Sequence, residues 1–289
     1  MRKRDQHKVM TVIKANGETE RFNEDKIRQS LLRSGAKPDT IDYVINKVKN
    51  KLYQNISTKK LYQIVYSELR KKHRPSAGKY HLKRAIMELG PTGFPFEKYI
   101  AEIFKAEGYQ TQTGKIIMGR CVKHEVDVIA ENDAEQFMME CKFHSEPGTV
   151  CNVKHALYVS ARFQDIDRKI NAGATTGSKP FKGWLVTNTR MTSDAEQYAV
   201  CFGLGLLSWN FPKGKSLRER IDKTGLHPIT CITSLTRAEK NQLLDKMIVM
   251  CKNLCTTPNV LLEIGISELR AKRIIEEANN ICKNKIKTV

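Results

Sequence analysis

The chain has 289 residues, of which 50 are lysine or arginine and 31 are aspartate or glutamate, so its formal net charge is +19. This length predicts two or three domains, and a hydrophobic content of 40% provides for packed cores and argues against a largely disordered chain. The charge indicates a polyanionic partner: nucleic acid, nucleotide or an anionic membrane surface. No apolar run approaches about 18 residues, so we expect no membrane-spanning segment.

The cysteines and the N-terminal residues indicate a cytoplasmic protein. Eight cysteines are spread singly along the chain, which is typical of reduced thiols rather than of a disulfide framework. The first ten residues are basic but contain no apolar stretch of the kind that signal peptides require. We therefore expect the protein to stay in the cytoplasm.

The charge is unevenly distributed, and its distribution divides the chain into three parts. The net charge is +13 for residues 1–90, zero for residues 91–213 and +6 for residues 214–289. We expect a domain for each part, and a fold of the α+β or α/β class. The predicted order is a small hairpin with helices, a mixed-sheet α/β domain and a helical C-terminal region.

Residues 11–22 predict a tight β-hairpin, because two short strand-like runs flank Asn16 and Gly17. This dipeptide tolerates the positive φ angles of a type I′ turn. Asn23 then stands where a helix N-cap belongs, and Gly35 follows the expected end of that helix. The first part of the chain therefore starts with a hairpin that leads directly into a helix.

Three further helices complete the first part. Pro38 is typical of a helix start, Ser57 is a candidate cap for the next helix, and a fourth helix is expected over residues 76–89. Apolar residues recur at helical spacing in the second and third of these four helices. The prediction is a small hairpin that covers four helices.

This arrangement resembles the ATP cone, the nucleotide-sensing domain of ribonucleotide reductases and of their transcriptional repressor. The matching residues are Val12-Ile13-Lys14-Ala15-Asn16-Gly17, Glu20, Phe22, Asn23, Lys26-Ile27 and Ser57-Thr58. The resemblance implies that ATP or dATP binds under the hairpin. The binding residues that it implies are Val12, Lys14, Glu20, Asn23, Lys26 and Thr58.

In this interpretation Lys14 and Lys26 meet the phosphates, which require clustered cations. Glu20 and Asn23 meet the sugar or the base edge, and Thr58 contacts the nucleotide from the opposite helix. The alternative is a basic helical DNA-binding domain whose lysines are solvated.

ATP is expected to act as a signal rather than as a fuel. A Walker A loop would supply the phosphate cradle of an ATPase, and the nearest candidate is residues 173–180. Its glycine spacing is wrong, and Pro180 stands where a serine or threonine is required. A ribonucleotide reductase component is set aside because the chain has no recognisable radical or thiol-reduction constellation.

The neutral middle part predicts a mixed sheet between helices. The expected elements are a helix over 94–108, strands over 116–122, 126–130 and 136–143, a helix over 152–166, a strand over 184–187, a helix from 193 and a strand over 204–207.

The residues that carry chemistry are two carboxylates and a lysine on the predicted strands. Asp127 and Glu140 are separated by enough residues for one hairpin, which places them at neighbouring strand positions. Glu140 and Lys142 are two residues apart, so both point to one face of the sheet. Two carboxylates and the backbone carbonyl of Cys141 form an oxygen site suited to Mg²⁺ or Mn²⁺. Glu97, on the preceding helix, adds a further carboxylate.

Lys142 is expected to orient the attacking water and to stabilise the charge that develops on a phosphodiester. The catalytic set is thus Glu97, Asp127, Glu140 and Lys142, and the metal set is Asp127, Glu140 and Cys141.

This pattern resembles the PD-(D/E)xK nucleases, and Mrr-type restriction endonucleases among them. The resemblance covers about residues 94–212. It rests on Phe96-Glu97, Glu125-Val126-Asp127, Glu140-Cys141-Lys142, Leu185-Val186-Thr187-Asn188, Ser193-Asp194-Ala195-Glu196-Gln197-Tyr198-Ala199 and Leu206-Leu207-Ser208-Trp209. Two departures are Val126 in place of the family's proline, and Val122-Lys123-His124-Glu125 in place of a Gly-rich approach. They leave the preference for a particular DNA unassigned.

Two alternatives stand beside this interpretation. A half-exposed strand with alternating charges has the same pattern as the proposed catalytic strand. The pairs Cys121/His124 and Cys141/His144 look like two halves of a zinc site. In a regular strand, however, Cys141 and His144 point to opposite faces.

The C-terminal part, residues 214–289, predicts helices, including one from Leu235 to Met250. Residues 261–275 resemble half of a helix-hairpin-helix, in which turn amides bind a DNA phosphate. Only one of the two usual glycines is present, so an ordinary helical hairpin is the alternative. Arg270, Lys272 and Arg273 are candidates for a DNA backbone contact or for a solvated face.

The sequence therefore predicts a cytoplasmic, Mg²⁺-dependent endonuclease that cuts DNA under the control of ATP or dATP. Because the cone often controls assembly in its family, we expect a nucleotide-dependent homo-oligomer and no membrane partner. The alternative is an ATP-sensing DNA-binding regulator whose nuclease-like domain is catalytically silent.

Overall fold

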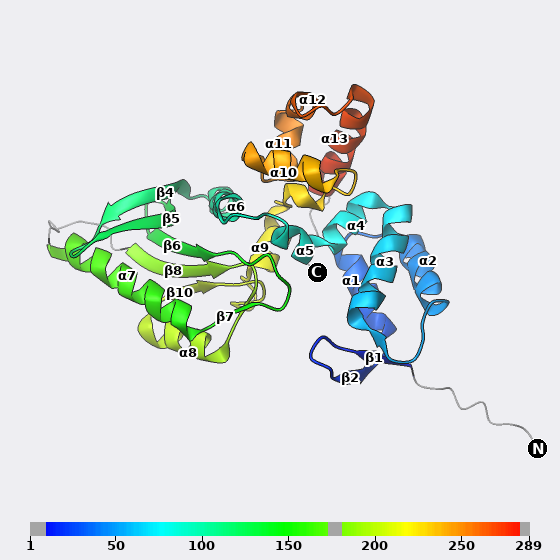
Figure 1. The fold of residues 1–289 in the computed structure, drawn as a ribbon, viewed down its shortest axis with the longest axis horizontal. Helices are drawn as coiled ribbons and strands as arrows, with labels where there is room; N and C mark the ends of the chain where they lie inside the picture. Colours follow the sequence, from blue (N-terminus) through cyan, green and yellow to red (C-terminus); the bar gives the residue numbers. More distant parts are fainter. Residues whose placement is uncertain (1–9, 173–180, 284–289) are drawn as a thin grey trace, which may run out of the picture.

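The computed structural model describes residues 10–172 and 181–283, and its elements fall into three groups along the chain (Figure 1). Residues 173–180, the rejected phosphate-loop candidate, lie outside the described residues. The first group consists of β1 (Thr11–Ile13), β2 (Thr19–Arg21), α1 (Glu24–Arg33), α2 (Pro38–Lys49), β3 (Ile56–Ser57), α3 (Thr58–Lys72), α4 (Arg74–Tyr80) and α5 (Leu82–Met87).

The helix starts of this first group follow the predicted caps. The Asn23 side chain accepts a hydrogen bond from the Lys26 amide, and the Ser57 side chain accepts one from the Lys60 amide. Each bond satisfies an amide that has no partner within its helix. The expected fourth helix is divided in two at His81, which is not part of either α4 or α5.

The hairpin is present, but its turn is not of type I′. Asn16 does not have a positive φ, whereas Gly17 has φ of +85°. The Gly17 amide donates to the Lys14 carbonyl at 3.0 Å and the Lys14 amide donates to the Glu18 carbonyl at 2.8 Å. The loop is therefore longer than the two-residue loop of a type I′ hairpin, and a single glycine adopts the left-handed backbone conformation. The third strand, β3, joins the hairpin by pairing parallel to β1.

The second group forms a mixed five-stranded sheet, in the order β10-β8-β6-β5-β4. Its elements are α6 (Phe94–Ala106), β4 (Gln110–Met118), β5 (Lys123–Glu131), β6 (Gln136–Lys142), β7 (Val150–Cys151), α7 (Val153–Ala172), β8 (Phe181–Thr187), β9 (Arg190–Met191), α8 (Ser193–Phe202) and β10 (Gly205–Leu207). Strands β4, β5 and β6 are antiparallel, whereas β6, β8 and β10 are parallel.

Helices cover both faces of this sheet. One apolar cluster joins α7 and α8 to Val126, Met138 and Leu185, and another joins α6 to Met139 and Val186 on the other face. In Figure 1, α7 and α8 lie together along one side of the sheet and α6 lies on the other. Burial of alternate strand residues against two helical layers accounts for the strongly apolar central strands.

The first strand of the sheet begins earlier than expected. Strand β4 covers Gln110–Met118 rather than residues 116–122, and most of its side chains are exposed. It lies at the edge of the sheet, where one side of the backbone has no neighbouring strand and polar side chains are tolerated. Residues 119–122 instead form a turn closed by the Gly119 amide and the Val122 carbonyl.

The third group is helical in most of its length. It consists of α9 (Leu217–Thr224), a short 3-10 turn η1 (Ile229–Cys231), α10 (Arg237–Asp245), α11 (Cys251–Thr256), α12 (Val260–Glu263) and α13 (Glu268–Lys283). The segment 225–236 departs from the expected continuous helicity. It is almost entirely buried, and Pro228 together with β-branched residues disfavours a helix there. No described helix has both the length and the apolar character needed to cross a membrane.

The third group packs on the end of the first. The Thr230 hydroxyl donates to the Ala85 carbonyl at 2.5 Å, and the Arg70 guanidinium donates to the Thr233 carbonyl at 2.9 Å. Gly78 of α4 faces η1 so closely that a Cβ at this position would overlap the carbonyl oxygen of Cys231. The two groups are therefore in direct backbone contact.

Candidate active site and nucleotide site

The predicted catalytic carboxylates come from three elements that meet at one end of the central sheet. Asp127 lies in β5, Glu140 lies in β6, and Glu97 lies in the first turn of α6. Strands β5 and β6 are antiparallel with Val128 opposite Met139, so the next residues, Asp127 and Glu140, are neighbours across the two strands. The structure thus brings together the two carboxylates that the sequence predicted to be adjacent.

Asp127 occupies an interruption in the sheet. In the β4–β5 ladder the residues on either side of Gly114 and Asp127 are paired, but Gly114 and Asp127 are not paired with each other. Gly114 has φ of +62°. One carboxylate oxygen of Asp127, Oδ2, accepts a hydrogen bond from the Cys141 amide at 2.6 Å. Its side chain is therefore held by the backbone of β6, next to the carbonyl predicted as a metal ligand.

Glu140 is 5% exposed, and two cations balance its charge. Lys142 Nζ lies 2.6 Å from Oε1, and the guanidinium of Arg162, from α7, forms an ion pair with Oε2. The same guanidinium donates to the carbonyl of Glu125. The ring of Tyr158 lies beside both cations, 5.9 Å from Lys142 Nζ and 5.5 Å from the guanidinium carbon of Arg162. Glu140, Lys142 and Arg162 thus each have at least two neighbours at the site.

Burial and neighbouring charges change the acidity of Glu97 and Asp127. Burial, reinforced by the charges of Asp127, Glu125 and Glu140, raises the pKa of Glu97 to about 7. Burial and the charge of Glu140 raise the pKa of Asp127 to about 6, against the opposing effect of the Cys141 amide. Burial lowers the pKa of Lys142, but the neighbouring carboxylates outweigh this effect and the net pKa is raised. The lysine is therefore protonated at neutral pH, whereas Glu97 is near its midpoint and Asp127 is mostly ionised.

Arg162 and Tyr158 are site residues that the sequence reasoning missed. Arg162 is three residues after Val159 and four before Ile166, both of which are buried. That spacing places the arginine on the apolar side of the predicted helix, where a charge requires a partner. The sequence therefore indicated that Arg162 has a charged or polar partner, but it did not identify that partner.

The residues of the zinc alternative have other partners. The Cys121 amide and His124 Nε2 both bind the carboxylate of Asp165, at 2.9 and 2.8 Å. His144 Nε2 lies 3.7 Å from the Sγ of Cys151, which is not one of the four residues of the zinc alternative. In residues 10–172 and 181–283, no group of three or more histidine, cysteine or acidic side chains has the arrangement of a metal cluster. The predicted magnesium site is of another kind, since it combines two carboxylates with a backbone carbonyl.

The predicted nucleotide residues gather beside the N-terminal hairpin. Lys14 Nζ lies 3.2 Å from Glu18 and 3.4 Å from Glu20, and Lys26 Nζ lies 3.2 Å from Glu20. Burial does not shield these side chains, and the side-chain hydrogen bond from Lys26 lowers the pKa of Glu20. A triphosphate could therefore replace Glu18 and Glu20 as the partner of the lysines.

The remaining nucleotide residues are positioned by the strands and the first helix. Strands β1 and β3 are parallel with Ile13 opposite Ser57, so the next residues, Lys14 and Thr58, are at the same end of the strand pair. Val12 is buried beneath the hairpin. Asn23 uses its side chain to cap α1, which fixes it at the positive end of the helix dipole.

The C-terminal candidate for DNA contact has most of its groups engaged within the protein. The amides of Gly265 and Ile266, between α12 and α13, donate to the carbonyls of Leu262 and Leu261. The guanidinium of Arg270 binds Glu239 at 2.6 Å, whereas Lys272 and Arg273 are exposed. This arrangement is that of a helical hairpin, and the DNA contact remains a prediction.

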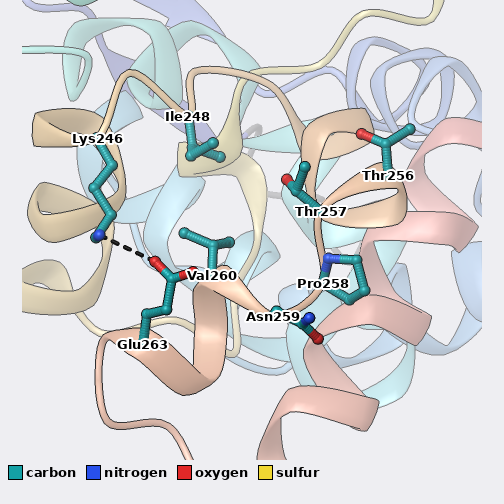
Figure 2. Close-up of a pocket in the computed structure, with 8 residues that line it drawn as sticks. All are labelled: Lys246, Ile248, Thr256, Thr257, Pro258, Asn259, Val260 and Glu263. Carbon is teal, nitrogen blue, oxygen red and sulfur yellow. Dashed lines mark hydrogen bonds and ion pairs between the residues drawn. The ribbon is translucent and has the colours of Figure 1, made fainter.

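A cavity next to this hairpin does not add a chemical site. Figure 2 shows its walls, in which the ion pair between Lys246 and Glu263 crosses one side at 3.1 Å. The other walls are formed by aliphatic groups, hydroxyl groups and Asn259. The cavity therefore combines one satisfied ion pair with neutral surfaces.

Comparison with known proteins identifies each of the three parts. A family model for the ATP cone domain matches residues 10–86, one for restriction endonucleases of the Mrr catalytic type matches residues 91–208, and one for the AF1548-like C-terminal domain matches residues 227–282. The fold and the matches together define a restriction endonuclease-like domain that follows an ATP cone.

An uncharacterized protein of Archaeoglobus fulgidus is 33% identical over 183 residues, which is 63% of this chain and 99% of that protein. The crystal structure of AF1548, a protein of unknown function, is 32% identical, has a TM-score of 0.54, and covers 66% of this chain and 98% of its own. The chain therefore belongs to the family of this archaeal protein.

The structure of Can2 from Sulfobacillus thermosulfidooxidans, in complex with cyclic tetra-adenylate, is also similar over 66% of this chain and 60% of its own. Its identity is 12% and its TM-score is 0.30, so the likeness supports no argument about fold or ligand.

Proposed function

We propose that the protein is a Mg²⁺-dependent endonuclease that hydrolyses DNA phosphodiester bonds and is regulated by ATP or dATP. The observation that carries this proposal is the convergence of Glu97, Asp127 and Glu140 with Lys142. Burial, together with the repulsion between neighbouring carboxylates, raises the pKa values of Glu97 and Asp127, so keeping these groups ionised here costs free energy. A divalent cation would remove the repulsion.

The donor set fits a magnesium or manganese ion. Asp127, Glu140 and the carbonyl of Cys141 would hold it, since these hard ions prefer oxygen ligands and retain several waters. When bound, the ion would supply positive charge to the phosphodiester. Glu140 would have to exchange at least one of its present cation partners, Lys142 or Arg162, for the ion.

Lys142 and Glu97 would complete the catalytic apparatus. The protonated Lys142 would orient the attacking water and stabilise the charge that develops on the phosphate. Glu97, with a pKa of about 7, can hold or release a proton at neutral pH beside the same carboxylates. The protein residues thus provide a cation, a proton acceptor and a fixed position for the phosphate.

The nucleotide would bind at the hairpin. Lys14 and Lys26 would exchange their present carboxylate partners for the triphosphate, and Thr58 would contact the nucleotide from α3. Glu20 and Asn23 would position the sugar or base, above the buried Val12. The cone is in backbone contact with the third part of the chain, so a nucleotide could change assembly through this contact.

We further propose that the protein acts in the cytoplasm as a nucleotide-dependent homo-oligomer. All eight cysteines are free thiols in the structure, which suits a reducing compartment. Each nuclease site cuts one strand, so cleavage of both strands calls for two copies or for two successive cuts.

Plasmid cleavage tests this function directly. Supercoiled plasmid is incubated with the full chain and Mg²⁺ in the presence of ATP, dATP or neither, and sedimentation is measured in parallel. We expect cleavage that EDTA stops, that Asp127→Ala and Lys142→Ala abolish, and that the exposed control Lys123→Ala retains. Equal cutting by Asp127→Ala and the parent would contradict the assignment, and identical cleavage and mass under all nucleotide conditions would contradict the regulation.

One observation favours a second function, an ATP-sensing DNA-binding regulator with a silent nuclease-like domain. The carboxylate of Glu140 is already neutralised by Lys142 and Arg162. If these pairs persist in the presence of Mg²⁺, the site cannot bind the ion. Salt-sensitive DNA binding that survives EDTA, with no cleavage under any nucleotide, would support this function instead.

A further inference from the structure

A second cluster of cations lies where the three parts of the chain meet, and it shares no residue with either site described above. It surrounds a cavity of about 190 Å³. The walls come from the end of α1, from α4 and α5, from Trp209 shortly after β10, from α9, and from His227 between α9 and η1. The cavity therefore joins the ATP cone, the nuclease domain and the C-terminal region.

The cavity is strongly positive. Arg33, Lys79, Lys83 and Arg218 line it, and Asp222 is the one carboxylate among its described lining residues. Within the described part of the chain, the side chains of Arg33, Lys83 and Arg218 have no carboxylate at ion-pair distance. Like charges that converge without such partners repel one another and favour an anion.

The floor and the rim of the cavity differ in exposure. Lys79 and His227 form a buried floor, with exposed fractions of 7% and 2%. Burial, followed by the charge of Lys79, lowers the pKa of His227 to about 4, so the imidazole is neutral at physiological pH. Burial also lowers the pKa of Lys79. The floor thus consists of a buried lysine and a neutral imidazole, and the exposed rim is accessible to a ligand from solvent.

The negative end of α1 does not cancel these cations. This helix ends at the cavity, but its last carbonyls have donors within the protein. The Ser34 hydroxyl donates to the Leu31 carbonyl at 2.6 Å and the Gly35 amide donates to the Leu32 carbonyl at 2.9 Å. Their partial charge is therefore largely satisfied by the cap.

The cavity is also distinct from the nucleotide site of the cone. Lys26 lies in the first turn of α1 and Arg33 is its last residue. At about 1.5 Å per residue, the two side chains begin roughly 10 Å apart along the helix and mark its opposite ends. The volume is below the roughly 300–1,000 Å³ typical of sites that enclose a whole small molecule, so it suits a phosphate group.

We propose that this junction cavity binds a phosphate group and thereby fixes the ATP cone, the nuclease domain and the C-terminal region in one arrangement. Arg33 contributes from the cone, Arg218 from the segment after the sheet, and Lys79 from the buried floor. The phosphate can belong to a small phosphorylated ligand or to the backbone of DNA. Both sources present the same group to the same cations.

Tryptophan fluorescence of the full chain tests this proposal. The chain has two tryptophans, and Trp209 lines the cavity with Lys83 Nζ 6.0 Å from its ring. In a Trp184→Phe background, Trp209 is therefore the reporter. Inorganic phosphate and pyrophosphate are titrated against chloride at constant ionic strength, and a short DNA duplex is titrated in a separate arm.

We expect a saturable change in Trp209 emission with one of these probes. The double variant Arg33→Gln/Arg218→Gln should bind that probe at least about tenfold more weakly, because it loses two charge-assisted contacts. The matched control Arg237→Gln, on the surface of α10, should bind as the parent does. A response to the inorganic anions identifies a small phosphorylated ligand, and a response to the duplex alone identifies DNA as the source.

A thermal melt measures binding of the same probe independently of the fluorescence signal. The bound probe should raise the Tm of the parent and of Arg237→Gln but not that of the double variant. The absence of any response, or an equal response in the double variant, would overturn the proposal. Asp127→Ala should bind the probe normally, so loss of nuclease activity and loss of the phosphate site are separate outcomes.

Discussion

Replacement of Asp127 by asparagine should stabilise the folded protein at neutral and alkaline pH in the absence of a divalent ion. The pKa of Asp127 is about 6 in the fold and its ordinary value is 3.8. At about 1.4 kcal/mol per unit, this difference destabilises the fold by up to about 3 kcal/mol when the carboxylate is ionised. The asparagine oxygen can keep the hydrogen bond from the Cys141 amide, but without a charge the bond is about 1 kcal/mol weaker.

The expected net gain is therefore about 1–2 kcal/mol at pH 8. The sign follows from proton linkage: the folded state binds more protons than the unfolded state between about pH 4 and pH 6, so the parent loses stability as the pH rises through this window. The gain in the free energy of unfolding from Asp127→Asn should accordingly be small near pH 4, should grow up to about pH 6, and should level off above pH 7.

Denaturant unfolding across this pH range measures the effect, and a thermal scan should show a Tm rise of roughly 2–5 °C at pH 8. Asp133→Asn, in the exposed turn between β5 and β6, is the control and should stay within about 0.5 kcal/mol of the parent. Saturating Mg²⁺ should stabilise the parent and not the variant. A variant that is less stable than the parent at pH 8, or whose advantage is independent of pH, would refute this account of the site.

Three further predictions concern other parts of the molecule. Arg162→Met should free one oxygen of Glu140, so isothermal titration should show several-fold tighter Mg²⁺ binding. Without metal, the free energy of unfolding should fall by about 1–3 kcal/mol. An unchanged Mg²⁺ affinity would show that the ion does not compete with the arginine. Gly78→Ala should reduce the free energy of unfolding by about 2–4 kcal/mol because its Cβ has no room against η1, and a neutral effect in denaturant melts would contradict this close packing. Lys26→Met should weaken ATP binding at least about tenfold in equilibrium dialysis. The control Lys47→Met, on the next helix, should bind ATP as the parent does. An equal loss of ATP affinity in both variants would indicate a nonspecific effect of charge.

Features with a local cause could be predicted from the sequence. The caps at Asn23 and Ser57 depend on a side chain and an amide three residues away, so their positions could be read directly. The adjacency of Asp127 and Glu140 follows from one hairpin and the two-residue period of strands. In each case the interacting groups are close in sequence, and the geometry of a single element determines the outcome.

Features that depend on distant partners could not be predicted. Arg162 reaches Glu140 only because α7 packs on that face of the sheet, and no local pattern specifies this contact. The start of β4 was missed because an edge strand has no buried alternation to reveal it. The length of the hairpin loop at Asn16 could not be predicted because it depends on the register between two very short strands.

The largest apolar core has a consequence for dissection of the chain. It includes Leu82, Ala85, Ile86 and Leu89 from the end of the cone, together with α6, one face of the central sheet and most of the third part. A nuclease fragment that starts at residue 91 would leave a hole where these four side chains pack, and buried aliphatic truncations of this kind cost about 2–5 kcal/mol each. A fragment that starts near residue 81 would keep these four side chains but would lose α4, whose Gly78 packs directly against the carbonyl of Cys231. The last helix of the ATP cone thus also belongs to the core of the restriction endonuclease-like domain, and a cut on either side of this helix removes packing from that domain or from the C-terminal region.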